Sequence, residues 1–191
     1  MKTHRITTPL KTEDIEELKV GDKVLLSGYI YTARDAAHQR LIDQIKNNEE
    51  LPFQLEGQVL YYVGPTPAPE GKVIGSAGPT TSLRMDRPTP TLLDLGLKGM
   101  IGKGDRSIEV VESIKKNGCV YFAALGGAGA LIANSILTAE VIAYEDLGTE
   151  AIRRLEVKEL PVVVAIDQQG NNLYHIGPDN YKKDLAKVKT I

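Results

Sequence analysis

The 191-residue chain has no tryptophan, two phenylalanines and a single cysteine, Cys119. One cysteine excludes an internal disulfide and is typical of a reducing compartment, so we expect a cytoplasmic protein. One thiol also cannot supply the three or four thiolates of an iron–sulfur cluster, so any such cluster would be held by another chain. No apolar run approaches the roughly 18–20 residues of a membrane span, and the start, MKTHR, leads into polar sequence without a signal-type stretch.

The chain also lacks an excess of charge of one sign. Its 23 Lys and Arg against 25 Asp and Glu give a net charge of -2, which provides no general attraction to nucleic acid or to an acidic membrane. The 42% hydrophobic and 25% charged residues exclude global disorder, and the length suits one domain with a sizeable core. We expect residues 1–191 to form this domain, with the segment 1–20 and a C-terminal tail helix over 178–191 at its periphery.

Hydrophobic patterning predicts helices that alternate with strands. Strands are expected over 23–31, 58–63, 72–76, 97–101, 119–125, 138–143 and 161–166, and helices over 34–48, 89–96, 106–116 and 129–135, with a short helix or turn over 11–19. Asn117-Gly118 is a typical helix stop, and residues 167–172 form a hairpin-type turn. Because strands alternate with helices in the middle and hairpin-like strands flank them, the pattern predicts a mixed α/β domain with a partly parallel sheet.

The first candidate stretch, residues 32–38 (TARDAAH), follows a predicted strand and opens a predicted helix. Arg34 and His38 are four residues apart, so they share one helix face. Free backbone N–H groups at a helix start also favour an anion, so the stretch is consistent with an anion clamp. The alternative is structural: Thr32 would cap the helix, Arg34 would pair with a nearby acid, and His38 would be a solvated surface residue.

The second candidate stretch, residues 75–86 (GSAGPTTSLRMD), has three consecutive hydroxyl side chains after a Gly-Pro turn. A helical turn over 80–86 would place Thr80 and Arg84 on the same side. An arginine binds a carboxylate through two parallel hydrogen bonds, whereas a threonine acts as a base only when a neighbouring group takes its proton. The alternative is a helix N-cap formed by Thr80 or Thr81, with Arg84 on the surface.

Two glycine-rich turns follow further strands. In Gly102-Lys103-Gly104 the glycines would let the backbone approach a ligand beside an ammonium group, although the alternative is a plain turn and the P-loop pattern is absent. Residues 126–131 (GGAGAL) carry glycines at 126, 127 and 129, which is not the spacing of a dinucleotide loop. We expect close helix–strand packing there, or a glycine loop that lines the same pocket.

The three cations Arg34, Arg84 and Lys103 each come at a turn after a predicted strand. Such turns gather at one edge of an α/β sheet, so we expect the three side chains to meet in one hollow. Converging cations in a chain of net charge -2 indicate a small polyanion as ligand. A dicarboxylate suits the arginines, and a phosphate ester is the alternative, although a glycine-cradled helix start with the proper spacing is missing. The histidines lack partners at metal-ligand spacing, so no metal site is expected in this chain.

The strings GYIYTARDAAHQR, GPTTSLRMD, IGKGD and GGAGAL, in this order, resemble the β subunit, or C-terminal domain, of class I fumarate hydratases and the related L-tartrate dehydratases. The resemblance runs from about Thr7 to the turn at 170–173. It implies a swivelling β/β/α-type fold with a mixed sheet. It also implies a hydro-lyase in which an α subunit or N-terminal domain supplies the cysteines of a [4Fe–4S] cluster, in an assembly of α2β2 type. The single cysteine agrees with this division.

The resemblance assigns Arg34, Arg84 and Lys103 to the substrate carboxylates, and Thr80 to proton abstraction at C3 of malate. The partner's cluster would act as Lewis acid on the leaving hydroxyl. Proton abstraction next to a carboxylate builds negative charge, which fixed cations stabilise more in the transition state than in the ground state. An acidic residue of the partner or Asp86 would accept the proton from Thr80. Residues expected to support the site are Thr81, Asp86, His38, Gly102, Gly104 and Gly127.

Residues 33–38 (ARDAAH) resemble the fumarase version, whereas tartrate dehydratases tend to carry cysteines around this arginine. We therefore expect (S)-malate and fumarate as substrates, with L-tartrate as the alternative. A non-catalytic domain that binds an anionic metabolite or docks on another protein would need the cations but not the Thr80 hydroxyl. A nucleotide-dependent enzyme would need a phosphate loop that we do not find. Because the cluster would come from outside, the face with Arg34, Thr80 and Lys103 should be exposed in the isolated chain.

Overall fold

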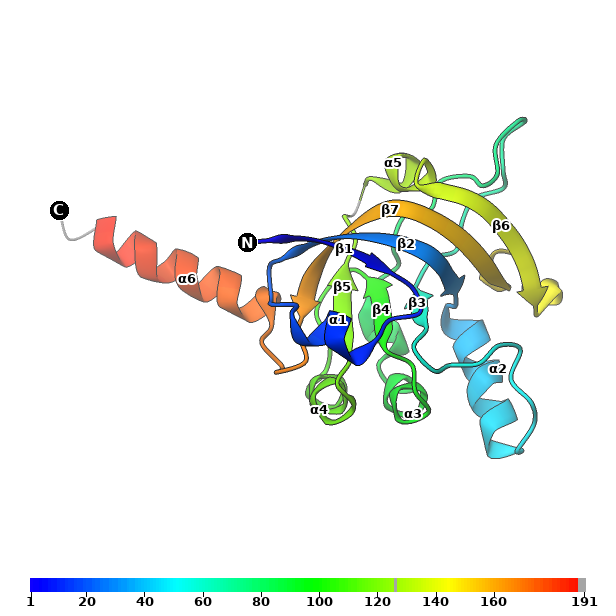
Figure 1. Cartoon of the computed structure of the whole chain (residues 1–191), viewed down its shortest axis with the longest axis horizontal. Helices are drawn as coiled ribbons and strands as arrows, with labels where there is room; N and C mark the ends of the chain where they lie inside the picture. The colour runs from blue at the N-terminus through cyan, green and yellow to red at the C-terminus, as the bar shows by residue number, and fades with distance from the viewer. Residues whose placement is uncertain (126, 189–191) are drawn as a thin grey trace.

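The computed structural model describes residues 1–125 and 127–188 (Figure 1). Its strands form one sheet in the order β1-β2-β3-β4-β5-β7-β6. The strands β1 to β5 run parallel to one another, whereas β7 is antiparallel to β5 and β6, so the predicted mixed sheet is confirmed. The strands are β1 (Thr3–Thr7), β2 (Lys23–Thr32), β3 (Val59–Tyr61), β4 (Gly99–Gly102), β5 (Val120–Ala123), β6 (Ile136–Ala143) and β7 (Ile152–Ile166).

The long strand β7 closes the sheet into a barrel. Besides β5 and β6, it pairs antiparallel with β2 from Lys23↔Val163 to Tyr31↔Arg154, so β2, β3, β4, β5 and β7 form a ring. The sequence predicted only its second half, over 161–166, because five of the seven residues from 153 to 159 are charged. These charges alternate with buried Leu155 and Val157, which is the period-two pattern of a half-buried strand.

Two hydrophobic cores lie on the two faces of the central parallel strands. Along β3, Val59 and Tyr61 belong to one core, and Leu60 to the other. The same alternation gives Phe122 to the first core and Tyr121 to the second. Parallel strands covered on both faces read as continuous apolar runs, which is why residues 58–63 and 119–125 were recognisable as strands. The strands β3, β4 and β5 are therefore firmly held from both sides.

The helices cover the barrel and extend from it (Figure 1). Residues of α2, α3 and α4 contribute to the second core, whereas α6 extends away from the barrel in Figure 1. The predicted stop of α4 is confirmed, since Gly118 follows it in the left-handed conformation with φ 58°. The helices are α1 (Thr12–Glu16), α2 (Asp35–Lys46), α3 (Thr89–Asp94), α4 (Ile108–Asn117), α5 (Gly129–Ala133) and α6 (Leu173–Val188), with 3-10 turns η1 (Ser82–Met85) and η2 (Glu145–Glu150).

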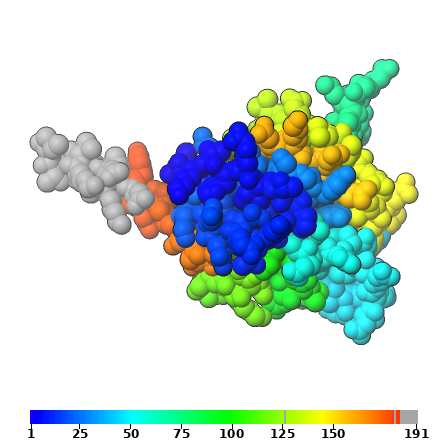
Figure 2. All heavy atoms as spheres, viewed as in Figure 1, coloured from blue at the N-terminus to red at the C-terminus, as the bar shows by residue number. Residues whose placement is uncertain are grey.

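Two further predictions need correction. Residues 72–76 form no strand and belong to an arm, coloured teal in Figure 2, in which Lys72 and Val73 are exposed whereas Ile74 is buried in the core. The Ser76 N–H at the base of this arm donates to the Thr66 hydroxyl at 2.8 Å. The helical turn expected over 80–86 starts only at Ser82. After the confirmed turn at 167–172, a single bridge joins Asn172 to Ile166, and α6 begins immediately.

The two ends of the chain differ in how they meet the barrel. In the N-terminal segment 1–20, β1 is an edge strand, and the side chains of Ile15 and Leu18 are buried in the core. At the other end, the predicted tail helix over 178–191 corresponds to the later part of α6. Gly126 and residues 189–191, which the predictions included, lie outside the described residues.

Candidate functional site

The candidate residues follow neighbouring parallel strands at the end where each strand stops. Arg34 comes two residues after β2, and Lys103 directly follows β4. The register aligns Thr32 with Tyr61 and Tyr61 with Ile101, so β2, β3 and β4 end at one edge. In α/β sheets this carboxyl edge is where ligands bind. The strand order therefore brings these two cations to the same edge.

The segment with Thr80 lies along this edge between β3 and β4. The Thr80 backbone N–H donates to the Tyr62 carbonyl at 2.7 Å, and the Thr80 carbonyl accepts from the Lys103 N–H at 3.2 Å. The Ser82 N–H in turn donates to the Lys103 carbonyl at 2.9 Å, and Thr81 pairs with Lys103 as a parallel bridge. Thr80 is half-buried, whereas Thr81 and Lys103 are exposed. Thr80 and Lys103 are thus direct neighbours, although neither lies on a helix.

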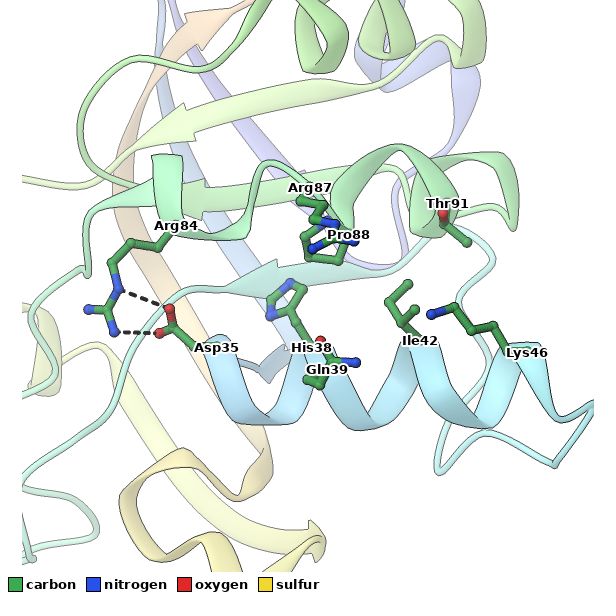
Figure 3. A pocket seen from close by; sticks show the side chains of 9 residues that line it. All are labelled: Asp35, His38, Gln39, Ile42, Lys46, Arg84, Arg87, Pro88 and Thr91. Carbon is green, nitrogen blue, oxygen red and sulfur yellow. Dashed lines mark hydrogen bonds and ion pairs between the residues drawn. The ribbon is translucent and has the colours of Figure 1, made fainter.

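Both candidate arginines have an acidic neighbour. The Arg84 Nε donates to Asp35 Oδ1 at 2.9 Å, and its Nη2 lies 2.8 Å from Asp35 Oδ2 (Figure 3). Asp35 follows Arg34 in the chain, so this pair brings Arg84 to the start of α2. The Nη2 of Arg34 lies 3.5 Å from Glu150 Oε1, which agrees with the structural alternative for this arginine. The side chain of Arg84 is 52% exposed, so its partner is open to exchange.

The glycines around Lys103 allow a close approach of two segments. A Cβ on Gly102 would lie 1.9 Å from the Ser82 hydroxyl, so a side chain there is excluded unless η1 moves. Gly104 has φ +84°, a conformation that favours glycine. Its carbonyl accepts from the Tyr121 hydroxyl at 2.9 Å, and its N–H donates to the Tyr174 hydroxyl at 2.9 Å. The turn that carries Lys103 is therefore anchored from β5 and from α6.

Gly127 follows β5, and so it also lies beyond the carboxyl end of a parallel strand. It is exposed, and a Cβ there would meet nothing within 4 Å, although its φ of +81° favours glycine. At Gly129 of the same run, a Cβ would lie 2.4 Å from the Ser76 hydroxyl, so this glycine packs closely against a segment that is not a strand, rather than against the expected strand.

Asp86 belongs to a buried network. Its Oδ1 accepts from Arg106 Nε at 2.6 Å, and its Oδ2 accepts from the Ser107 N–H. Arg106 is buried, and its guanidinium lies over the rings of Tyr62 and Tyr121. Both oxygens of the Asp86 carboxylate thus already accept from donors of this chain.

His38 is buried rather than solvated, with 1% of its surface exposed, which corrects the structural alternative. Its Nδ1 donates to the Arg34 carbonyl at 2.8 Å, and its ring meets the Tyr62 ring edge-on. Burial lowers its pKa from 6.5 to about 4, so the imidazole is neutral near pH 7. Thr32 does not cap α2 either, because its hydroxyl donates to the Ala151 carbonyl.

A cavity of about 550 Å³ lies between α2 and the segment that precedes and begins α3 (Figure 3). Arg84 and His38 line it, but Arg34, Thr80 and Lys103 do not, so this cavity is not the expected hollow with all three cations. The four candidate residues instead lie along an open edge of the barrel. The cavity is lined by Asp35, His38, Gln39, Ile42, Lys46, Arg84, Arg87, Pro88 and Thr91.

Cys119 is part of the core and unsuited to metal binding. Its Sγ donates to the Leu97 carbonyl, and burial raises its pKa to about 12. Across residues 1–125 and 127–188, no group of three His, Cys, Asp or Glu side chains could hold a metal ion. The residues present therefore do not fit an iron–sulfur cluster. Within the same ranges, no helix is both long and apolar enough to cross a membrane.

Sequence reasoning missed two contributors to this edge. Glu150, which contacts Arg34, is 116 positions away in the chain and belongs to a segment without a recognisable pattern. Tyr174, which binds Gly104, lies at the start of α6, just after the predicted turn at 167–172. Neither residue carries a local signal, because its role depends on the closure of the barrel and on where α6 begins.

The sequence is similar to that of several known proteins and matches one protein family. The family model for the fumarase C-terminus matches residues 2–177. A protein of Methanocaldococcus jannaschii with the provisional name L(+)-tartrate dehydratase subunit beta is 40% identical over 171 residues, which cover 86% of this chain and 88% of that protein. That name indicates a partner subunit for the archaeal protein.

Two fumarate hydratases match over a smaller share of their length. The aerobic class I fumarate hydratase of Escherichia coli is 37% identical over 84% of this chain and 30% of its own length. Fumarate hydratase 2 of Leishmania major is 35% identical over 85% of this chain and 29% of its own. The chain thus spans less than a third of these two enzymes. Enzymes with these names are hydro-lyases, and the chain belongs to the fumarase C-terminus family.

Proposed function

We propose that the chain is the β subunit of a hydro-lyase that interconverts (S)-malate and fumarate. The observation that carries this proposal is the meeting of separate motifs at one edge: Thr80 is hydrogen-bonded to Lys103, and Arg84 is paired with the residue after Arg34. These residues come from three motifs spread over 70 positions, yet the parallel strands bring them together. Two arginines and a lysine supply the charge that a dicarboxylate requires.

The three cations would bind the two substrate carboxylates and stabilise the reaction. Removal of a proton next to a carboxylate moves negative charge onto that group. Fixed positive charge therefore stabilises the transition state more than the ground state. Arg84 would exchange Asp35 for a substrate carboxylate, since both are carboxylates and the pair is half open to solvent. Lys103, on an anchored turn, would add charge without a large movement.

Thr80 would take the proton from C3, and its hydroxyl must therefore pass a proton on. A threonine hydroxyl is too weak a base to act without a neighbouring acceptor. Asp86 is occupied by Arg106 and the Ser107 N–H. The acceptor in this proposal is accordingly an acidic residue of the partner subunit. The nearby Lys103 cation would favour the ionised form of the hydroxyl.

The proposed partner is a fumarase α subunit, in an assembly of α2β2 type. The family resemblance implies a [4Fe–4S] cluster, and the donor set of this chain does not fit one, so the partner would hold it. The exposed Arg84, Thr81 and Lys103 leave the candidate edge accessible for such a partner. Iron absorbance in the isolated chain after anaerobic reconstitution would contradict this assignment.

A second candidate substrate, L-tartrate, is favoured by the archaeal relative, whose name refers to that compound. Both substrates are hydroxydicarboxylates and would use the same cations. The distinction is measured by anaerobic co-expression with a candidate α subunit and comparison of kcat/KM for malate and for L-tartrate. A higher value for tartrate would replace malate in the proposal.

The test of the catalytic assignment is Thr80→Ala in the reconstituted complex. We expect kcat for malate dehydration to fall by about 10²–10⁴-fold while KM changes little, because the hydroxyl moves a proton and the cations bind the substrate. Thr80→Ser, which restores a hydroxyl, should recover part of the activity. Thr138→Ala, at an exposed threonine of β6, is the matched control. Unchanged turnover in Thr80→Ala would instead favour a non-catalytic binding domain.

A further inference from the structure

The guanidinium of Arg34 occupies the space next to Gly64 that a side chain at this position would fill. A Cβ built on Gly64 would lie 2.3 Å from Arg34 Nη1 and 3.1 Å from its Cδ. Any side chain at position 64 would therefore displace the end of the arginine. The backbone φ of Gly64 is outside the range that favours glycine, so an alanine there would fit the backbone. The reason for glycine at this position is the space that Arg34 occupies.

Glu150 contacts the same guanidinium at its other terminal nitrogen. Its Oε2 accepts from the Ala36 N–H at 2.9 Å, and its Oε1 lies 3.5 Å from Arg34 Nη2. One carboxylate thus binds both the start of α2 and the side chain that precedes it. Both side chains of this ion pair are about four-fifths buried, with 21% and 22% exposed. A pair with so little access to water is screened less than a surface pair.

The position of Glu150 is itself determined by the barrel. The Thr32 hydroxyl donates to the Ala151 carbonyl at 3.2 Å and accepts from the Arg153 N–H at 2.9 Å. These bonds join the end of β2 to the residues that directly follow Glu150. Glu150 and Arg34 therefore sit on two segments that are fastened to each other, and their distance does not depend on a mobile loop.

We infer that Glu150 and Gly64 are positioning residues that fix the guanidinium of Arg34 for a substrate carboxylate. This inference rests on the proposed function and adds two residues that touch no substrate. A long arginine side chain loses rotamer freedom when it binds, and a guanidinium that is already held has less to lose. Glu150 holds Arg34 by charge, and Gly64 leaves the room that its guanidinium occupies. A change of charge at position 150 and an added methyl group at position 64 should therefore both displace Arg34.

The kinetic test uses Glu150→Gln and Gly64→Ala in the complex reconstituted with its α subunit. The glutamine keeps an acceptor for the Ala36 N–H and removes only the charge. We expect each variant to lose about 10-fold to 100-fold in kcat/KM, mainly through KM, because a displaced binding group weakens substrate binding. The matched controls are Glu145→Gln, an exposed acid of the same η2 segment, and Gly177→Ala, where a Cβ would meet nothing within 4 Å.

A double-mutant cycle decides whether the effect passes through Arg34. In an Arg34→Ala background, neither Glu150→Gln nor Gly64→Ala should lower kcat/KM further, because the group that they position is absent. If either variant causes its full loss in that background, the positioning role is wrong. A loss shared by the Glu145→Gln control would equally overturn it.

A measurement on the isolated chain separates this inference from the proposed function. The Nε–H resonance of Arg34, assigned with the Arg34→Ala variant, should shift or broaden in both Glu150→Gln and Gly64→Ala. The resonance of buried Arg106 should stay unchanged and reports that the fold is intact. An unchanged Arg34 signal in both variants overturns the inference. If the Arg34 signal of the isolated chain changes but the reconstituted complex is inactive on both malate and L-tartrate, the positioning of Arg34 is supported and the proposed function is rejected.

Discussion

Two arginine–aspartate pairs in this chain use the same groups in opposite surroundings. Arg106 and Asp86 lie in the layer between the barrel and its helices, where their side chains are 0% and 9% exposed. Arg84 and Asp35 lie at the carboxyl edge of the sheet and are 52% and 34% exposed. The distances are similar, since the shortest N–O contact is 2.6 Å in the first pair and 2.8 Å in the second. Burial, rather than geometry, separates their roles.

The buried pair has no capacity left for a ligand. Besides Asp86, Arg106 donates to the Thr89 hydroxyl at 2.8 Å and to the Met100 sulfur, and it lies over two tyrosine rings. A buried charge requires such complete pairing, because an uncompensated one is costly. The exposed pair is held by a single acid, and water already competes with it. The interior layer therefore supports the fold, whereas in the proposed function the edge keeps cations available for an anion.

The largest expected effect comes from breaking the interior pair. Asp86→Ala leaves the Arg106 guanidinium buried without its acid, and we expect a loss of about 3–5 kcal/mol in the free energy of unfolding. Asp35→Ala removes the acid of the exposed pair and should cost no more than about 1 kcal/mol. Urea denaturation of both variants measures the difference. Equal losses would show that burial does not distinguish the two pairs.

The second largest effect is expected for the exposed pair and concerns activity rather than stability. Arg84→Ala should leave the free energy of unfolding almost unchanged and lower kcat/KM for malate by about 10²–10³-fold, as expected for a lost contact to developing charge. Steady-state assays of the reconstituted complex measure this loss. Arg154→Ala is the matched control, because Arg154 also forms an exposed ion pair, with Glu140 at 2.8 Å. This pair joins β7 to β6. A similar loss in both variants would remove the special role of the edge.

The sequence was sufficient to predict features that local chemistry determines. The buried strands are continuous apolar runs, the end of α4 is marked by Gly118, and Arg34 and Lys103 directly follow strands. Their meeting at one edge followed from the parallel order of the strands. The short edge strand β1 was not predicted, because THRIT has too few apolar residues for a strand pattern. The first half of β7 was missed because its charges hid the alternation.

The contacts of the site depended on closure of the barrel and could not be predicted. Asp35 and Arg84 are 49 positions apart, and Glu150 reaches α2 from a 3-10 turn before β7. His38 is different, since a signal for its burial was present. It lies between Ala37 and Leu41 on the face of α2 that carries the apolar residues, and all three are buried. Helical spacing alone predicts a position in the core, but because histidine is polar, the structural alternative in the sequence analysis placed His38 at the surface.

The smallest effect concerns this buried histidine and follows from its depressed pKa. Burial, the largest cause, and the nearby Arg106 lower the pKa of His38, whereas the Arg34 carbonyl and Asp35 raise it, and the net pKa is about 4. The unfolded chain binds a proton near pH 6.5, and the folded chain does not until about pH 4. His38 therefore leaves stability intact above pH 6.5 and reduces it as the pH falls from there toward 4, by about 1.4 kcal/mol per unit.

Between pH 7 and pH 5.5, this histidine should account for about 1 kcal/mol of lost unfolding free energy. His38→Gln keeps a donor for the Arg34 carbonyl and lacks the titration, so its loss over this range should be smaller by that amount. Urea denaturation of both proteins at the two pH values measures the difference, in which groups common to both cancel. Equal losses would contradict a neutral, buried His38.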